Sequence, residues 1–219
     1  MNMKIHRLSR LIGASACVAA AACSFMAPQP DLTQYFILSP TAPSSSSATF
    51  TASTARLSVG VGPISFPGYL RRPGVVTRTT SNRLIVSDEK RWGEPLDRNF
   101  ESVLGQNLSQ ILGTRKITNY PWYADTHIDY QVAVWVERFE AAEDGRSWLT
   151  ALWTIKDGQD GHELASGQSL TNAPIQDCDA AGSVALSQNL GELSRQIAER
   201  IAELNTISTR RAAQNSKAN

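Results

Sequence analysis

Two segments with the apolar period of an α-helix restrict most strongly what this chain can fold into. The first runs from Pro95 to Gly113 and the second from about Asp179 to Leu204. Each carries one apolar stripe, so each helix must bury one face against another layer. The stripes consist of Leu96, Phe100, Val103, Leu104, Leu108, Ile111 and Leu112 in the first segment and of Leu186, Leu190, Leu193, Ile197, Ile201 and Leu204 in the second.

Outside these helices the apolar period changes to two, which is typical of half-buried β-strands. Gly-bearing turns separate the last three strands in the manner of hairpins. The pattern predicts an α+β fold: a single domain with a mixed, mostly antiparallel sheet and two long amphipathic helices packed on it. The predicted strands cover residues 33–38, 56–64, 74–79, 83–87, 128–139, 148–155 and 163–170.

Several strands are apolar on both faces. Alternation places Trp135 and Phe139 on one face of their strand, and Trp148 and Trp153 follow on the next strand. These are more aromatic residues than one covered sheet face explains. We therefore expect a second covered surface or a contact between copies of the chain, that is, a homo-oligomer.

The first 22 residues are typical of an export signal. Lys4, Arg7 and Arg10 form a positive region, and the 12 apolar and small residues 11–22 that follow are too few to span a bilayer. They end in four alanines (19–22), and the last three together with Cys23 resemble a bacterial lipoprotein cleavage box. We predict that the signal peptide is removed and that Cys23 is lipidated.

Two other interpretations of this region stay open. Ala20 stands where the usual cleavage box has Leu, so an ordinary signal peptidase could release a free secreted protein. Cys17 could carry the lipid instead, but only six residues separate it from Arg10, fewer than the usual seven to about 15. Ser24 is not the Asp that tends to retain lipoproteins at the inner membrane in bacteria resembling Escherichia. It predicts a periplasmic protein anchored to the inner leaflet of the outer membrane.

The predicted organisation has four parts. They are a signal peptide (1–22), a lipidated N-terminus with a short strand and a Ser/Thr/Pro-rich linker (23–55), the α+β domain (56–204) and a flexible tail (205–219). The whole chain has 219 residues and a net charge of +1, with 42% hydrophobic and 19% charged residues. This composition excludes a disordered chain and a nucleic-acid binder of high positive charge. Removal of residues 1–22 takes away three positive charges and no acid, so the net charge becomes −2.

No constellation of catalytic residues is visible in the sequence. Three Cys and three His in the whole chain are too few for a zinc cluster or a disulfide framework. His127 and His162 have no Ser, Cys or second His at the spacing of a catalytic triad or metal site, so we expect surface histidines. Cys178 is a lone thiol that we expect to be a small buried residue at a helix start. The sequence predicts no enzyme, no metal and no cofactor.

One region has a strong local charge. Six basic residues fall within residues 71–91, against only Asp88 and Glu89. They are Arg71, Arg72, Arg78, Arg83, Lys90 and Arg91. A solvated loop and hairpin would explain them, but so would a contact for an acidic partner surface or for anionic lipid headgroups.

Five short segments occur in this chain in the same order as in one protein family. They are YFILSP (35–40), VGPI (61–64), PGYLRRP (67–73), RWGEPLD (91–97) and YPW (120–122). Together they resemble the ABC-type transport auxiliary lipoproteins of the PqiC/YmbA type over about residues 35–204. The resemblance implies a non-enzymatic periplasmic lipoprotein of the outer membrane. Its partner would be an MCE-domain protein that carries phospholipid between the two membranes.

Within that implied role, we place a docking surface at residues 67–73 and 91–96, because aromatic residues, Pro and Arg are frequent interface anchors. The residues that we expect to bind the partner are Phe66, Tyr69, Arg71, Arg72, Arg91 and Trp92. Two rival roles share the same anchor and domain. One is an adaptor or activator of a cell-wall synthase, and the other is a periplasmic lipid-binding carrier with its own cavity.

Overall fold

The computed structural model describes residues 31–41, 52–176, 179 and 181–218. The chain divides into two units, Met1–Leu32 and Thr33–Asn219, and every helix and strand of the described residues lies in the second unit. The predicted signal peptide, Cys23 and Cys178 lie outside the described residues.

An eight-stranded mixed sheet is the framework of this second unit. Its longest ladders, β6–β7 and β7–β8, are antiparallel, as is β3–β4, whereas β2 and β3 both run parallel to β6. The strands are β1 (Gln34–Phe36), β2 (Ser58–Ser65), β3 (Gly74–Thr80), β4 (Arg83–Trp92), β5 (Lys116–Asn119), β6 (Tyr130–Ala142), β7 (Arg146–Asp157) and β8 (Glu163–Pro174). The α+β prediction is confirmed, and the four-residue strand β5 is an addition to it.

Strand β6 organises the sheet because it pairs on both edges. One edge pairs with β7 along almost its whole length. The other pairs with β2 near the start of β6 and with β3 at its end. Strand β1 extends the β3–β4 side by pairing with the last residues of β4, which confirms that the predicted short N-terminal strand joins the sheet.

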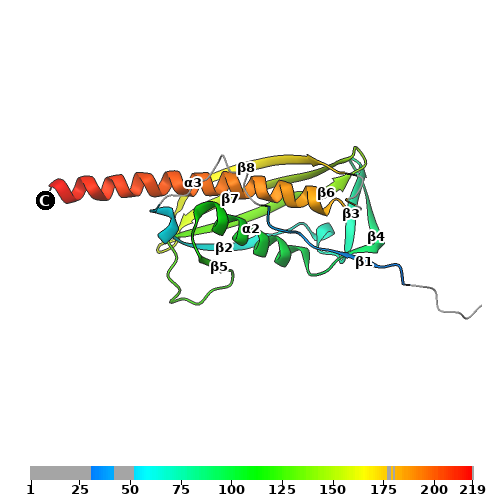
Figure 1. The fold of residues 1–219 in the computed structure, drawn as a ribbon, viewed down its shortest axis with the longest axis horizontal. Helices are drawn as coiled ribbons and strands as arrows, with labels where there is room; N and C mark the ends of the chain where they lie inside the picture. Colours follow the sequence, from blue (N-terminus) through cyan, green and yellow to red (C-terminus); the bar gives the residue numbers. More distant parts are fainter. Residues whose placement is uncertain (1–30, 42–51, 177–178, 180, 219) are drawn as a thin grey trace, which may run out of the picture. The chain divides into compact units, whose positions relative to one another are not determined.

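Two helices, α2 (Leu96–Leu112) and α3 (Ser183–Ala218), cover the same face of the sheet (Figure 1). Helix α2 starts one residue after Pro95, which is its N-cap and not its first residue as predicted, and Gly113 ends it in the left-handed conformation. Helix α3 starts later than predicted. Asp179 caps it, because its carboxylate accepts the backbone N–H of Ala185 at 3.0 Å.

The predicted end of α3 at Leu204 is wrong. The helix continues to Ala218, and its last turns project past the strands (Figure 1). Residues 205–218 contain neither Gly nor Pro, and the hydroxyl groups of Thr206 and Thr209 bond back to carbonyls four residues earlier. Adding turns to an existing helix is far easier than starting one, so a polar sequence suffices here.

The core lies between the helices and the sheet. At one end of it, Phe66, Phe100 and Phe139 pack edge to face, with ring centroids 5.2 to 6.4 Å apart. Between the two helices, the Asn107 amide donates a buried hydrogen bond of 3.1 Å to the Ser194 hydroxyl. The predicted apolar stripes of both helices are buried as expected, except that Leu204 is only partly buried.

The aromatic residues divide between the two sheet faces differently from simple alternation. The register of β6 shifts between Val136 and Arg138, so Phe139 turns to the helix face although Trp135 is on the opposite one. Trp153 also faces the helices. Trp135 is 62% exposed, and Trp148 packs under Arg138 at 5.0 Å. The sheet face away from the helices therefore exposes fewer aromatic residues than the sequence predicts.

Candidate functional site

The two sequence segments expected to dock a partner meet in space. The backbone N–H of Trp92 donates a 2.7 Å hydrogen bond to the carbonyl of Pro73, which ties the start of β3 to the end of β4. Next to this bond lies a cavity of about 420 Å³. We call it the Arg71–Asp97 groove. Its lining residues are Arg71, Arg72, Pro73, Trp92, Gly93, Glu94, Pro95, Leu96 and Asp97.

The six residues expected to bind a partner fall into two groups. Arg71, Arg72 and Arg91 are exposed and Tyr69 is half-buried. Phe66 and Trp92 are only 5% and 7% exposed. Phe66 belongs to the aromatic cluster of the core, and Trp92 forms part of the groove floor together with Leu96. These two aromatic side chains lie beneath the surface and support it. The side chains that a partner can contact directly are therefore those of the exposed arginines.

Of the predicted basic residues, Arg71 and Arg72 are the ones that line the groove. Within the part of the chain that the structure describes, neither guanidinium forms an ion pair. Arg91 donates from Nε to the carbonyl of Asp88 at 3.0 Å. Arg78, in contrast, is used inside the molecule and is unavailable to a partner.

The partner of Arg78 is a buried carboxylate that the sequence analysis did not single out. The side chain of Glu140 is fully buried, and its Oε1 accepts hydrogen bonds of 2.7 Å from Nε of both Arg78 and Arg138. Its Oε2 accepts a 2.8 Å bond from the Tyr69 hydroxyl. Burial of the phenol, reinforced by the neighbouring Glu140, raises the pKa of Tyr69 well above its ordinary value.

This network holds the groove in place. Tyr69 belongs to the one-turn helix η2 (Gly68–Leu70), which directly precedes Arg71 and Arg72. Through its hydroxyl, that turn is tied to β6 at the centre of the sheet. The backbone from which the two arginines project is therefore tied by a hydrogen bond to the central strand β6.

A second cavity of about 420 Å³ lies beside the C-terminal part of α3. The sequence predicts a flexible tail over residues 205–219. Because the helix continues, Ile207, Ser208 and Arg211 form part of the wall. The opposite side includes Asp129 and Asp157, so the cavity has polar walls of mixed charge.

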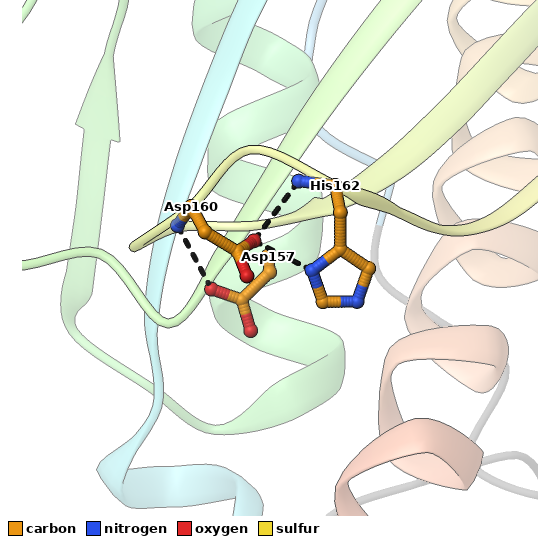
Figure 2. A group of neighbouring side chains, drawn as sticks. All are labelled: Asp157, Asp160 and His162. Atoms are coloured by element: carbon orange, nitrogen blue, oxygen red, sulfur yellow. Dashed lines mark hydrogen bonds and ion pairs between the residues drawn. The ribbon is translucent and has the colours of Figure 1, made fainter.

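The two histidines lie on the surface, as predicted. The His127 ring is 3.1 Å from Asp129. His162 and Asp160 lie in the loop between β7 and β8, next to Asp157, the last residue of β7. One potential metal-ligand atom of each of the three lies within 4.8 Å of the others (Figure 2).

The hydrogen bonds of this trio are those of a tight turn. Asp157 accepts the backbone N–H of Gln159 at 2.8 Å, and Asp160 accepts the backbone N–H of His162 at 3.0 Å. The ring and backbone N–H groups of His162 lower the pKa of the Asp160 carboxyl, the backbone bond contributing most. The turn explains why the three side chains are together, and the grouping by itself assigns no metal.

None of the helices that the structure describes has the length and apolar character needed to cross a membrane.

Known proteins share both the sequence pattern and the fold. A family model described as "ABC-type transport auxiliary lipoprotein component" matches residues 36–198. Among curated relatives, the intermembrane transport lipoprotein PqiC of Escherichia coli (strain K12) is 27% identical over 107 residues, or 48% of this chain and 54% of PqiC. The PqiC of Shigella flexneri matches equally. The chain thus spans about half the length of the curated relatives it matches.

Solved structures agree on the fold. Protein XCC0632 from Xanthomonas campestris has a TM-score of 0.64 at 15% identity, with 81% of this chain and 99% of that chain covered. A crystal structure of an uncharacterized protein has a TM-score of 0.57 at 20% identity, with 78% and 97% covered. With three quarters of the sequence matched by the family model, the chain belongs to the ABC-type transport auxiliary lipoprotein family.

Proposed function

We propose that this lipoprotein is an outer-membrane-anchored periplasmic component of an MCE-type system that moves phospholipid between the two membranes. It acts by docking and catalyses no reaction. A lipid on Cys23 holds the domain at the inner leaflet of the outer membrane, and the Arg71–Asp97 groove receives the end of an MCE-domain protein. The resulting bridge supports the integrity of the cell envelope.

The observation that carries the proposal is the meeting of residues 71–73 and 92–97 in one groove. They overlap the two segments selected from the sequence, residues 67–73 and 91–96, which the β3–β4 hairpin joins. Their exposed guanidinium groups, Arg71 and Arg72, form no ion pair with any described residue. Free arginines above an apolar floor suit a protein contact that buries an aliphatic or aromatic side chain and pairs a carboxylate.

Reversing both charges tests this placement. The full chain carrying Arg71→Glu and Arg72→Glu should capture at least about tenfold less MCE-domain protein after cross-linking in cells, because like charges across an interface cost several kcal/mol and about 1.4 kcal/mol is a factor of ten. The matched control is Arg210→Glu with Arg211→Glu, which makes the same charge change on exposed residues of α3. It should leave capture unchanged.

If the Arg71 and Arg72 double variant and the Arg210 and Arg211 control are both folded and capture the same amount of MCE-domain protein, docking at the groove is contradicted. The identity of the captured protein tests the wider proposal. An MCE-domain protein supports it, whereas a cell-wall synthase supports the adaptor role, and cross-links to lipid alone support a free carrier.

A further inference from the structure

The Arg71–Asp97 groove contains charges of both signs that do not neutralise each other. Arg71 and Arg72 come from the segment before β3, and Glu94 and Asp97 come from the segment that starts α2. Among the described residues, no ion pair joins the two sets. The groove is therefore lined by two basic residues from one segment and two acidic residues from the other.

The acidic side is held in position by the fold. The Glu94 carboxylate accepts a 2.8 Å hydrogen bond from the Asn99 amide, and Asn99 in turn belongs to the first turns of α2. The Asp97 carboxylate accepts the backbone N–H of Arg98 at 2.9 Å. Each carboxylate retains acceptor capacity, since an ionised carboxylate has about four lone-pair sites.

The floor of the groove is apolar. Trp92 and Leu96 are almost completely buried beneath it, and Pro73 and Pro95 flank them. The volume of about 420 Å³ lies in the range of roughly 300–1,000 Å³ that is usual for small-molecule sites. It is large enough for a small polar group and the glycerol unit that carries it.

We infer that the groove binds the zwitterionic headgroup of phosphatidylethanolamine. The phosphate lies against Arg71 and Arg72, which suit it because guanidinium groups bind phosphate oxygens in pairs of hydrogen bonds. The ammonium lies against Glu94 and Asp97, where it donates N–H bonds to two carboxylates. The glycerol and first acyl carbons contact Trp92 and Leu96.

The charges of the groove favour binding of this zwitterionic headgroup over binding of an anionic one. An anionic headgroup such as phosphatidylglycerol satisfies the arginines but presents its phosphate charge next to two carboxylates and offers them no cation. The inference rests on the proposed function in one respect: the headgroup would bind where a transport partner meets the protein. Binding itself needs no partner, so the two ideas can fail separately.

The test uses the full chain purified in non-ionic detergent micelles that contain equal amounts of phosphatidylethanolamine and phosphatidylglycerol. In parallel samples, one or the other lipid carries a photoreactive diazirine on an acyl chain near the glycerol, which leaves both headgroups unmodified. For the wild type we expect about threefold more cross-linking to phosphatidylethanolamine, mapped to peptides of the groove. Glu94→Gln with Asp97→Asn should reverse that preference, whereas Arg71→Gln with Arg72→Gln should abolish groove cross-links to both lipids.

Two matched controls make the charge changes elsewhere. They are Asp88→Asn with Glu89→Gln on β4 and Arg210→Gln with Arg211→Gln on α3, and both should keep the wild-type preference. Equal labelling by the two lipids in the wild type overturns the inference, as does an unchanged preference in the Glu94 and Asp97 variant. If the lipid preference fails while Arg71→Glu with Arg72→Glu still loses the MCE partner, the groove binds protein and not lipid. If the preference holds and partner capture is unaffected, the docking proposal falls instead.

Discussion

Replacing Glu140 by Gln tests the buried network that anchors the groove. The Glu140 carboxylate is fully buried and accepts bonds from two guanidinium groups and one phenol. A glutamine has nearly the same shape but removes the negative charge, and its amide nitrogen cannot accept a hydrogen bond. At least one of the donors Arg78, Arg138 and the backbone N–H of Phe139 then loses its acceptor.

The magnitude follows from how deeply these groups are buried. Breaking a fully buried ion pair costs about 3–5 kcal/mol. Arg78 and Arg138 keep 22% and 28% of their side-chain surface exposed, so water compensates part of the loss. We expect Glu140→Gln to lower the free energy of unfolding by about 2–3 kcal/mol, since hydrogen bonds to charged groups contribute about 1.5–3 kcal/mol. For a domain of this size the midpoint temperature should fall by about 4–12 °C.

The assay is urea unfolding at pH 7 followed by tryptophan fluorescence, with the free energy from linear extrapolation. The matched control is Glu137→Gln on the same strand, whose exposed side chain should change the free energy by no more than about 0.5 kcal/mol. If Glu140→Gln behaves like Glu137→Gln, the carboxylate is not a structural centre and the anchoring of η2 through Tyr69 is wrong. A double-mutant cycle with Tyr69→Phe should show coupling, because the two residues share one hydrogen bond.

Three further outcomes follow. Cys23→Ser should release the protein from the outer membrane into the soluble periplasm, because the lipid chains are lost; membrane fractionation that still finds it in the outer membrane refutes lipidation there. Phe100→Ala should cost about 3–5 kcal/mol in urea unfolding, because the ring is fully buried between Phe66 and Phe139. Deleting residues 212–219 should shift the midpoint of thermal unfolding by no more than about 2 °C, because the described side chains there are exposed; a larger fall would show that the end of α3 stabilises the domain.

The parts of the fold that depend on local periodicity could be predicted from the sequence. Both helices, the β6–β7–β8 meander and the Gly113 helix end follow from apolar spacing and turn residues. The order of the strands could not be predicted, because β2 and β3 share one edge of β6 through pairings that are distant in the chain. The short strand β5 has too few residues for a period to be visible.

One extra residue in β6, at the register shift between Val136 and Arg138, explains why the sequence assigned Phe139 to the wrong sheet face. Counting alternate residues from Val136 places Phe139 on the same face as Trp135, but the register shift at residue 137 reverses the faces from Arg138 onward. The same register shift also explains why the position of Glu140 could not be predicted from the sequence. In strict alternation it falls on the face of the buried valines, where no partner is evident, whereas the structure places it among Arg78, Arg138 and Tyr69.

The groove shows why charge summed along the sequence gives an incomplete prediction of the site. Residues 71–91 contain six basic residues and two acids, whereas Glu94 and Asp97 lie just beyond that stretch. When these two acids are included, the groove has two positive and two negative groups and no net charge. The β3–β4 hairpin leads the chain from Pro73 back to Trp92, so the start of α2 lies beside the arginines. The surface selected as basic therefore carries charges of both signs. That division favours a ligand with two opposite charges over a simple anion, and only the folded arrangement of the two segments reveals it.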